Sequence, residues 1–296
     1  MTDWKGVFTA LVTPFNEDDS LDEDGLRSLI QRQLDAGIHG LVPCGTTGES
    51  PALNQAEWER VIEITVAEAK GKATIIAGSG TNNTTVSAER TKRVGELGAD
   101  GALVITPYYN KPTEDGIVRH FVAIVEAAPD VPIMVYNVPG RTALNLTPAT
   151  LERLMDLPTI AAVKEASGSL AQVWEIVKLI VGNAVLFSGE DGLNLPIWDV
   201  GGVGTVSVLS NLVPELVVEQ WKAKMEGYSA DAYDLHRRLD RLVKAIFIET
   251  SPAPVKYALK LMGLPGGNVR PPLAPMRFES QDAVKQELLR LKLIKN

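Results

Sequence analysis

The sequence predicts a (β/α)8 barrel, the TIM-barrel class of α/β fold, with a helical appendage at its C-terminus. Eight short apolar segments alternate with longer amphipathic ones, and most begin about thirty residues apart, the length of one βαβ step. Most of these segments are continuously apolar, which is typical of parallel strands covered on both faces. The expected strands are Val7–Thr13, Gly40–Cys44, Thr74–Gly78, Gly101–Thr106, Ile133–Asn137, Ile160–Glu165, Val185–Ser188 and Gly204–Val208.

The stretches between these strands have the features of helices. Residues 21–37 carry leucine and isoleucine at helical spacing and stop at Gly37, a residue that favours helix ends. Residues 54–71 and 84–98 follow the same plan. Thr147 before Pro148 is a typical helix start, with a capping hydroxyl ahead of proline at the first helical position. The seventh unit, residues 192–201, is short, so its helix is expected to be stunted.

Beyond Gly227 the alternation stops, and residues 230–250, 252–263 and 280–293 are predicted to be helices. We therefore divide the chain into a barrel with the active site, residues 1–227, and a helical region, residues 228–296. A doubly wound open sheet is the alternative fold. It is disfavoured because no G-x-G-x-x-G motif follows the first strand.

Composition restricts the possible functions. The 296 residues carry a net charge of −8, which argues against nucleic acid as a partner. The single cysteine, Cys44, allows no internal disulfide. No secretory signal is recognisable, and no apolar run approaches the ~20 residues that span a membrane. These features predict a cytoplasmic protein without membrane contact.

Metal and cofactor motifs are not expected. The three histidines have no zinc-site spacing, and there is no nucleotide-binding P-loop and no nucleophile elbow of the G-x-S-x-G type. Glu190 and Asp191 could hold Mg²⁺, but we interpret them as a solvated loop pair. The prediction is an enzyme with no metal and no cofactor.

Function in this fold comes from the C-terminal ends of the strands, and polar residues gather there. Lys164 is the most informative of them, because it ends the apolar strand 160–165. A lysine that points into a closed barrel loses hydration, which lowers its pKa and favours the neutral amine. A neutral amine can attack a ketone to form an imine. The competing interpretation is a strand-end lysine whose ammonium reaches solvent.

Other residues at the predicted mouth fit a small keto acid. The turn at residues 45–49 offers hydroxyls and backbone N–H groups that can hold a carboxylate, although it also has the composition of a plain turn. Tyr136 and Tyr109 can move protons near an imine, or simply pack at the strand ends. Arg141 can bind a second carboxylate, whereas a surface arginine is the default interpretation.

Together these segments resemble the dihydrodipicolinate synthase family of pyruvate-dependent class I aldolases, over essentially the whole chain. The resemblance rests on the order and placement of four motifs. They are Gly45-Thr46-Thr47-Gly48-Glu49-Ser50, Thr106-Pro107-Tyr108-Tyr109, Tyr136-Asn137-Val138-Pro139-Gly140-Arg141-Thr142 and Val163-Lys164-Glu165-Ala166. The arginine in the third motif favours the synthase over sialic-acid and sugar-acid lyases of the same superfamily.

The resemblance implies roles for the mouth residues. Lys164 would form the imine with pyruvate, and the resulting enamine would add to L-aspartate 4-semialdehyde. Tyr136 would exchange protons through Thr46 and through Tyr109, which in the family reaches across a dimer interface. The expected substrate contacts are Thr47, Arg141, Gly189 and the backbone of Val206. Family members are commonly homotetramers built as dimers of dimers, so a homotetramer or a dimer is expected.

The resemblance also suggests a possible effector cleft, formed by Ser50, Asn82 and Tyr108. Lysine-inhibited bacterial members typically carry histidine and glutamate at the positions of Trp58 and Val86. The loss of that glutamate removes a partner for a lysine ammonium, so feedback inhibition by lysine is expected to be weak or absent.

Two alternatives to the synthase stay open from the sequence. A pyruvate-releasing aldolase on a sugar acid or N-acetylneuraminate would use the same Lys164 and Tyr136. A ligand-binding barrel without catalysis would keep the fold alone.

Overall fold

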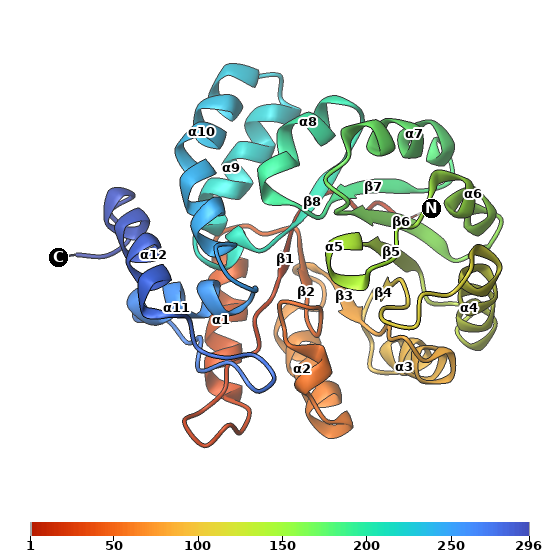
Figure 1. Ribbon diagram of the computed structural model, residues 1–296, viewed down its shortest axis with the longest axis horizontal. Helices are drawn as coiled ribbons and strands as arrows, with labels where there is room; N and C mark the ends of the chain where they lie inside the picture. The colour runs from red at the N-terminus through yellow and green to blue at the C-terminus, as the bar shows by residue number, and fades with distance from the viewer. Residues whose placement is uncertain (1, 296) are drawn as a thin grey trace.

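The computed structural model describes residues 2–295 as a closed barrel of eight parallel strands, each paired with the next in the chain and β8 with β1 (Figure 1). This confirms the predicted fold class. The strands are β1 Gly6–Ala10, β2 Gly40–Val42, β3 Thr74–Gly78, β4 Gly101–Ile105, β5 Ile133–Asn137, β6 Ile160–Glu165, β7 Val185–Ser188 and β8 Gly204–Ser207.

Four strands end earlier than their apolar segments predicted, namely β1, β2, β4 and β8. The apolar character continues past the last ladder hydrogen bond because the residues beyond it turn into the barrel mouth and stay buried. Leu11, Val12 and Thr13, for example, are almost fully buried although β1 has ended. Burial, not strand pairing, therefore sets the length of these apolar runs.

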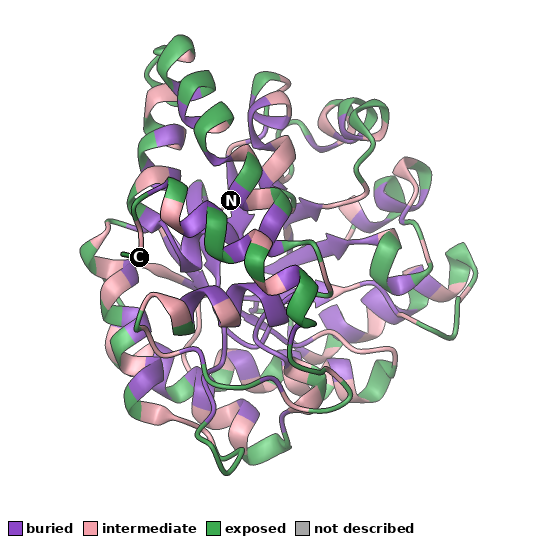
Figure 2. Cartoon of the chain, turned by 60° about the vertical axis from the view of Figure 1, so that its left-hand side comes forward, coloured by how far each residue is buried: buried purple, intermediate pink, exposed green. Residues whose placement is uncertain are grey.

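Helices cover the outside of the barrel, with buried residues on the side of the strands and exposed residues on the outer side (Figure 2). Side-chain caps start most of the longer ones, such as Asp22 before α1 and Asn54 before α2, where a full capping box forms. The barrel helices are α1 Glu23–Asp35, α2 Gln55–Ala69, α3 Thr84–Glu96, α4 Glu114–Ala127, α5 Pro139–Thr142, α6 Pro148–Met155, α7 Leu170–Ile180, α8 Asn194–Asp199 and α9 Pro214–Met225.

The seventh unit carries the short α8, which confirms the expected stunted helix. The sequence interpretation missed α5, a single turn between β5 and α6 that carries Arg141. Such a short turn leaves no hydrophobic periodicity to recognise.

Three further helices follow the barrel: α10 Ser229–Ile246, α11 Ala253–Leu261 and α12 Phe278–Arg290. In Figure 1 they stand beside α9 and α1, and α10 packs on both α9 and α12. The predicted division at residue 227 into two domains stays a prediction. Within residues 2–295, no helix is both long enough and apolar enough to cross a membrane.

Candidate active site

The ends of β5 and β6 bring the two main candidate residues together. Tyr136 and Lys164 are direct partners in the register of these neighbouring strands. The Lys164 ammonium nitrogen lies 3.9 Å from the centre of the Tyr136 ring. The structure therefore places an amine and a phenol side by side at the C-terminal end of the barrel, where this fold carries its chemistry.

Lys164 is buried, with 6% of its surface exposed. Burial and, to a smaller extent, the positive charge of Arg141 lower its pKa to about 7, against the opposing effect of the Asp191 carboxylate. Within residues 2–295, no carboxylate lies within salt-bridge distance of its Nζ. A substantial fraction of the neutral amine is therefore present near neutral pH, as a nucleophile requires. The alternative of a lysine that reaches solvent is wrong for this residue.

Tyr136 is also buried, and its hydroxyl is hydrogen-bonded to Thr46. Burial raises the pKa of Tyr136 to about 12, while Arg141 and the Thr46 hydrogen bond favour the phenolate. The phenol therefore stays protonated near neutral pH, with a hydroxyl partner that can accept or return its proton. The hydrogen bond between Tyr136 and Thr46 therefore favours a role in proton transfer over the alternative that Tyr136 only packs at the strand end.

The turn after β2 leaves backbone donors free at the mouth. Hydrogen bonds from Gly48 N and Ser50 N to Gly45 O close the turn, and Thr13 Oγ1 donates to Gly48 O at 2.8 Å. Within the described part of the chain, the N–H groups of Thr46 and Thr47 have no acceptor. Two adjacent free N–H groups beside a buried Thr47 side chain are suited to a carboxylate.

Gly189 and Val206 complete the wall around Lys164. A Cβ on Gly189 would lie 3.1 Å from Lys164 Cε and 2.9 Å from Ala166 Cβ, so glycine lets this loop lie close to the lysine stem. Val206 is the penultimate residue of β8 and is buried, so its strand ends at the same rim.

Asp191 corrects the sequence interpretation. Glu190 is exposed, but Asp191 is 4% exposed, so the two are not a solvated loop pair. Its Oδ2 accepts hydrogen bonds from the backbone N–H groups of Val208 and Leu209, both at 2.9 Å. Burial raises the pKa of Asp191, and its hydrogen bonds act against that rise. Within residues 2–295, no three acidic, histidine or cysteine side chains gather in a metal-binding cluster.

The sequence interpretation also missed a second buried carboxylate, Glu165, which forms hydrogen bonds next to the two reactive residues. Glu165 follows Lys164 and accepts hydrogen bonds from Ser167 N at 2.6 Å and from Asn137 Nδ2 at 3.0 Å. Asn137 follows Tyr136, so this bond joins the ends of β5 and β6 on the side facing the helices. The adjacent motif residues Tyr-Asn and Lys-Glu were the available signal.

Arg141 and Tyr109 differ in their placement. Arg141 is exposed on α5, yet its positive charge acts on the mouth and lowers the pKa of both Lys164 and Tyr136. Tyr109 is 86% exposed and has a left-handed backbone with φ 72°. A single chain does not bring Tyr109 into the site.

Of the three residues expected to form an effector cleft, two line the same cavity and one does not. Ser50 and Tyr108 line a cavity of about 70 Å³, together with Thr46, Tyr136 and Arg90, whereas Asn82 does not line it. Trp58 is fully buried and donates Nε1–H to Gly78 O at 2.9 Å.

A larger hollow of about 420 Å³ lies at the opposite end of the barrel, where the strands begin. This fold carries no active sites at that end.

Comparison with known proteins agrees with this geometry. The model of the dihydrodipicolinate synthetase family matches residues 3–291. The chain belongs to this family. Its members are lyases of the aldolase type, so the chain is an enzyme, and the resemblance that the four motifs indicated is confirmed.

Individual relatives match most of the chain. The 4-hydroxy-tetrahydrodipicolinate synthase of Thermomicrobium roseum is 47% identical over 92% of this chain and 89% of its own. The crystal structure of the dihydrodipicolinate synthase from Aquifex aeolicus has a TM-score of 0.96 at 39% identity, over 99% of this chain and 100% of its own. The Cyanidioschyzon merolae enzyme with lysine bound has a TM-score of 0.95 at 37% identity, over 98% and 99%.

Proposed function

We propose that this chain is a 4-hydroxy-tetrahydrodipicolinate synthase, which condenses pyruvate with L-aspartate 4-semialdehyde through a Schiff base on Lys164. The observation that carries the proposal is the buried, unpaired amine of Lys164 against Tyr136, with its pKa lowered to about 7. Relatives with 43–47% identity bear the name of this synthase.

The reaction begins when the neutral Lys164 amine attacks the keto carbon of pyruvate. Water leaves and an imine forms, and loss of a proton from the methyl carbon gives an enamine. The enamine carbon then bonds to the aldehyde carbon of the semialdehyde. Finally the amine of that substrate displaces Lys164 and closes the ring, which frees the enzyme for another turnover.

Tyr136 is proposed to move the protons of these steps. Its phenol donates a proton when water leaves and takes protons from the substrate, with Thr46 as its hydrogen-bonded partner. Tyr109 of a second subunit would extend this relay to solvent. Its 86% exposure in one chain leaves the side chain available for such a contact.

The substrates' carboxylates have separate places. The free N–H groups and hydroxyl of the Thr46–Thr47 turn, helped by the Val206 backbone, would hold the pyruvate carboxylate, and Gly189 leaves room beside the imine. Arg141 on the rim would hold the carboxylate of the semialdehyde by charge-assisted hydrogen bonds. Two anionic ends and one reactive centre account for the polarity of the mouth.

Self-association follows from the role given to Tyr109. We propose a homodimer, or a homotetramer formed from two dimers, working in the cytoplasm in lysine and diaminopimelate biosynthesis. Sedimentation of the purified chain tests the assembly. Tyr109→Phe should lower kcat while leaving the assembly intact, and an unchanged kcat would remove Tyr109 from the relay.

Borohydride trapping tests the function. Reduction in the presence of pyruvate should add the mass of reduced pyruvate to the peptide that contains Lys164, and no adduct would favour a barrel without catalysis. Turnover with aspartate semialdehyde then separates the synthase from its relatives. Activity only on sugar acids or N-acetylneuraminate would contradict the proposed substrate.

A further inference from the structure

A buried ion pair joins the C-terminal region to the turn that carries Thr46 and Thr47. Lys256 on α11 donates to Glu49 Oε1 at 2.6 Å and to the backbone oxygen of Asn268 at 2.7 Å. The two side chains are 2% and 1% exposed, and 207 residues separate them in the chain. None of the steps proposed above uses this pair.

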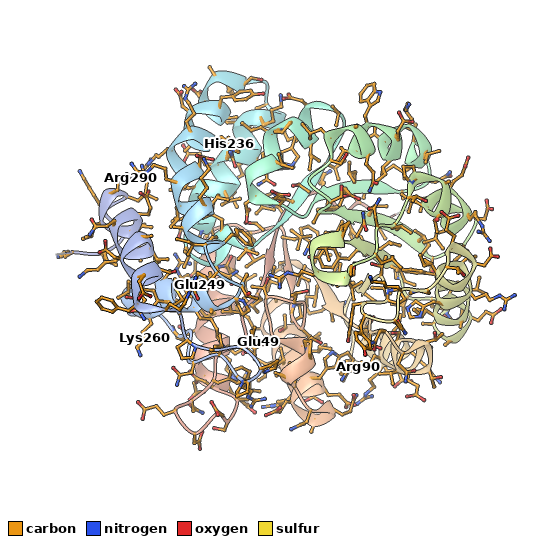
Figure 3. All side chains as sticks on the ribbon, in the orientation of Figure 1. Glu49, Arg90, His236, Glu249, Lys260 and Arg290 are labelled. Carbon is orange, nitrogen blue, oxygen red and sulfur yellow. The ribbon has the colours of Figure 1, made fainter. Side chains whose placement is uncertain are left out.

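Arg270 extends the contact. Its backbone N–H donates to the second oxygen of Glu49 at 2.9 Å, and its guanidinium pairs with Glu57 at 2.6 Å and donates to Ala52 O at 2.9 Å. Figure 1 shows the link between α11 and α12 reaching toward the start of α2, and Figure 3 labels Glu49 close to it. Both oxygens of Glu49 are thus bound by the C-terminal region.

The strained backbone at Glu49 explains why its carboxylate is fixed by hydrogen bonds from the C-terminal region. Glu49 has φ 54°, a left-handed conformation that costs about 1 kcal/mol for a residue with a side chain. It lies two residues after Thr47, and its N–H closes the turn on Thr46 O at 3.1 Å. Any outward movement of Glu49 therefore moves the two free N–H groups at the mouth.

A second contact reaches the opposite side of the mouth. The backbone oxygen of Ser251, just before α11, accepts a hydrogen bond from Arg141 Nη2 at 3.3 Å. The segment Ser251–Arg270, which we name the C-terminal brace, thus contacts both the turn and the arginine of the rim.

We propose that the C-terminal brace positions the pyruvate-binding turn, and that Lys256 and Glu49 are the positioning residues through which it acts. The proposal rests on the function proposed above. Because Lys164 stands on the other wall, at the end of β6, the brace does not supply the nucleophile. It determines where the carboxylate of the keto acid is held relative to that nucleophile.

The consequence of breaking the pair follows from its burial. Without the Lys256 ammonium, the Glu49 carboxylate is left charged in a dry site, and the turn must move outward to hydrate it. A displacement of about 1 Å at a substrate contact can cost 10²-fold in rate. We expect Lys256→Met to raise the pyruvate concentration that half-saturates imine formation at least about tenfold. The limiting trapping rate at saturating pyruvate should change much less.

The experiment measures borohydride trapping against pyruvate concentration for the purified full-length chain. Lys256→Met is compared with the double variant Glu49→Gln/Lys256→Met, which removes both charges at similar volume and should recover most of the pyruvate affinity. Leu288→Ala in α12 is the control, because Leu288 is fully buried in the C-terminal region but lies outside the Ser251–Arg270 brace. It should lower Tm and leave half-saturation unchanged.

The outcomes are distinct. A folded Lys256→Met whose half-saturation lies within twofold of the parent would overturn the proposal, as would a shift of equal size in Leu288→Ala. Should Lys256→Met fail to fold, Glu49→Gln, which breaks the same pair from the side of the turn, takes its place and is judged by the same twofold limit. No adduct in the parent itself would instead remove the proposed function on which the brace depends.

Discussion

Two buried lysines occupy different regions of this chain. Lys164 ends β6 at the barrel mouth, and Lys256 lies on α11 against the turn after β2. Burial lowers the pKa of both ammonium groups. Lys256, however, has a carboxylate at 2.6 Å and a carbonyl at 2.7 Å, whereas Lys164 faces the ring of Tyr136.

The difference shows that burial alone does not make a lysine reactive. An adjacent carboxylate restores the charged form and turns a buried lysine into a structural cation. Where the amine faces an aromatic ring and burial and a positive charge outweigh the nearest carboxylate, the amine loses its proton more readily and becomes a nucleophile. The predictions below test this contrast, beginning with the largest expected effect.

Lys164→Met should abolish imine formation and lower kcat by roughly 10³-fold or more, because it removes the amine that attacks the keto carbon. Borohydride trapping and steady-state rates measure this. Lys164→Arg is the matched control, since it keeps a cation that cannot form the imine, and it should be equally inactive. Appreciable adduct on another lysine in either variant would contradict the assignment.

Lys164→Met should also change how stability depends on pH. The pKa of Lys164 falls from 10.5 to about 7 on folding, so the unfolded chain binds the extra proton between these values. Burying the charge therefore costs the parent about 3 to 5 kcal/mol below pH 7, and this cost disappears as the pH rises toward 10. Denaturant unfolding should find the variant more stable at pH 6.5, with the difference closing by pH 10.

The comparison of parent and variant isolates Lys164, because Lys256 and the other titrating groups are common to both chains. A stability difference that stays constant between pH 6.5 and 10 would mean that the Lys164 amine has an ordinary pKa in the folded chain.

Asp191→Asn should shift the pH dependence of imine formation. The Asp191 carboxylate raises the pKa of Lys164, so its neutralisation lowers that pKa and moves the acidic limb of the rate profile to lower pH. The amide oxygen can still accept from Val208 N, so the fold should persist with a loss of about 1–3 kcal/mol. Glu190→Gln, a neighbouring exposed change, is the control and should not move the limb.

The barrel and the residues at its mouth could be predicted because they depend on local pattern. Continuous apolar runs mark buried parallel strands, and parallel strands carry their C-terminal residues to one rim. The pairing of Tyr136 with Lys164 follows from that geometry alone. Strand ends were overestimated because Leu11 to Thr13 stay buried after the ladder has ended.

What could not be predicted depends on contacts between distant parts of the chain. Asp191 was taken for a solvated residue because its two backbone donors, at residues 208 and 209, come from the segment just after β8. The Glu49–Lys256 pair joins segments 207 residues apart, and neither residue's neighbours reveal the other. Tyr109 is exposed in a single chain, and the contact with a second subunit that we propose for it is one that no pattern within one chain locates.

Free L-lysine should inhibit this enzyme weakly or not at all, because a bound lysine ammonium has the same need for a carboxylate partner as Lys256. The cavity lined by Ser50, Tyr108 and Arg90 has no acidic side chain among its lining residues, and Arg90 adds positive charge. Millimolar lysine should therefore lower the synthase rate less than twofold. Val86→Glu places a carboxylate on the adjacent helix and should increase inhibition, whereas half-inhibition of the parent below millimolar lysine would show that another group binds the ammonium.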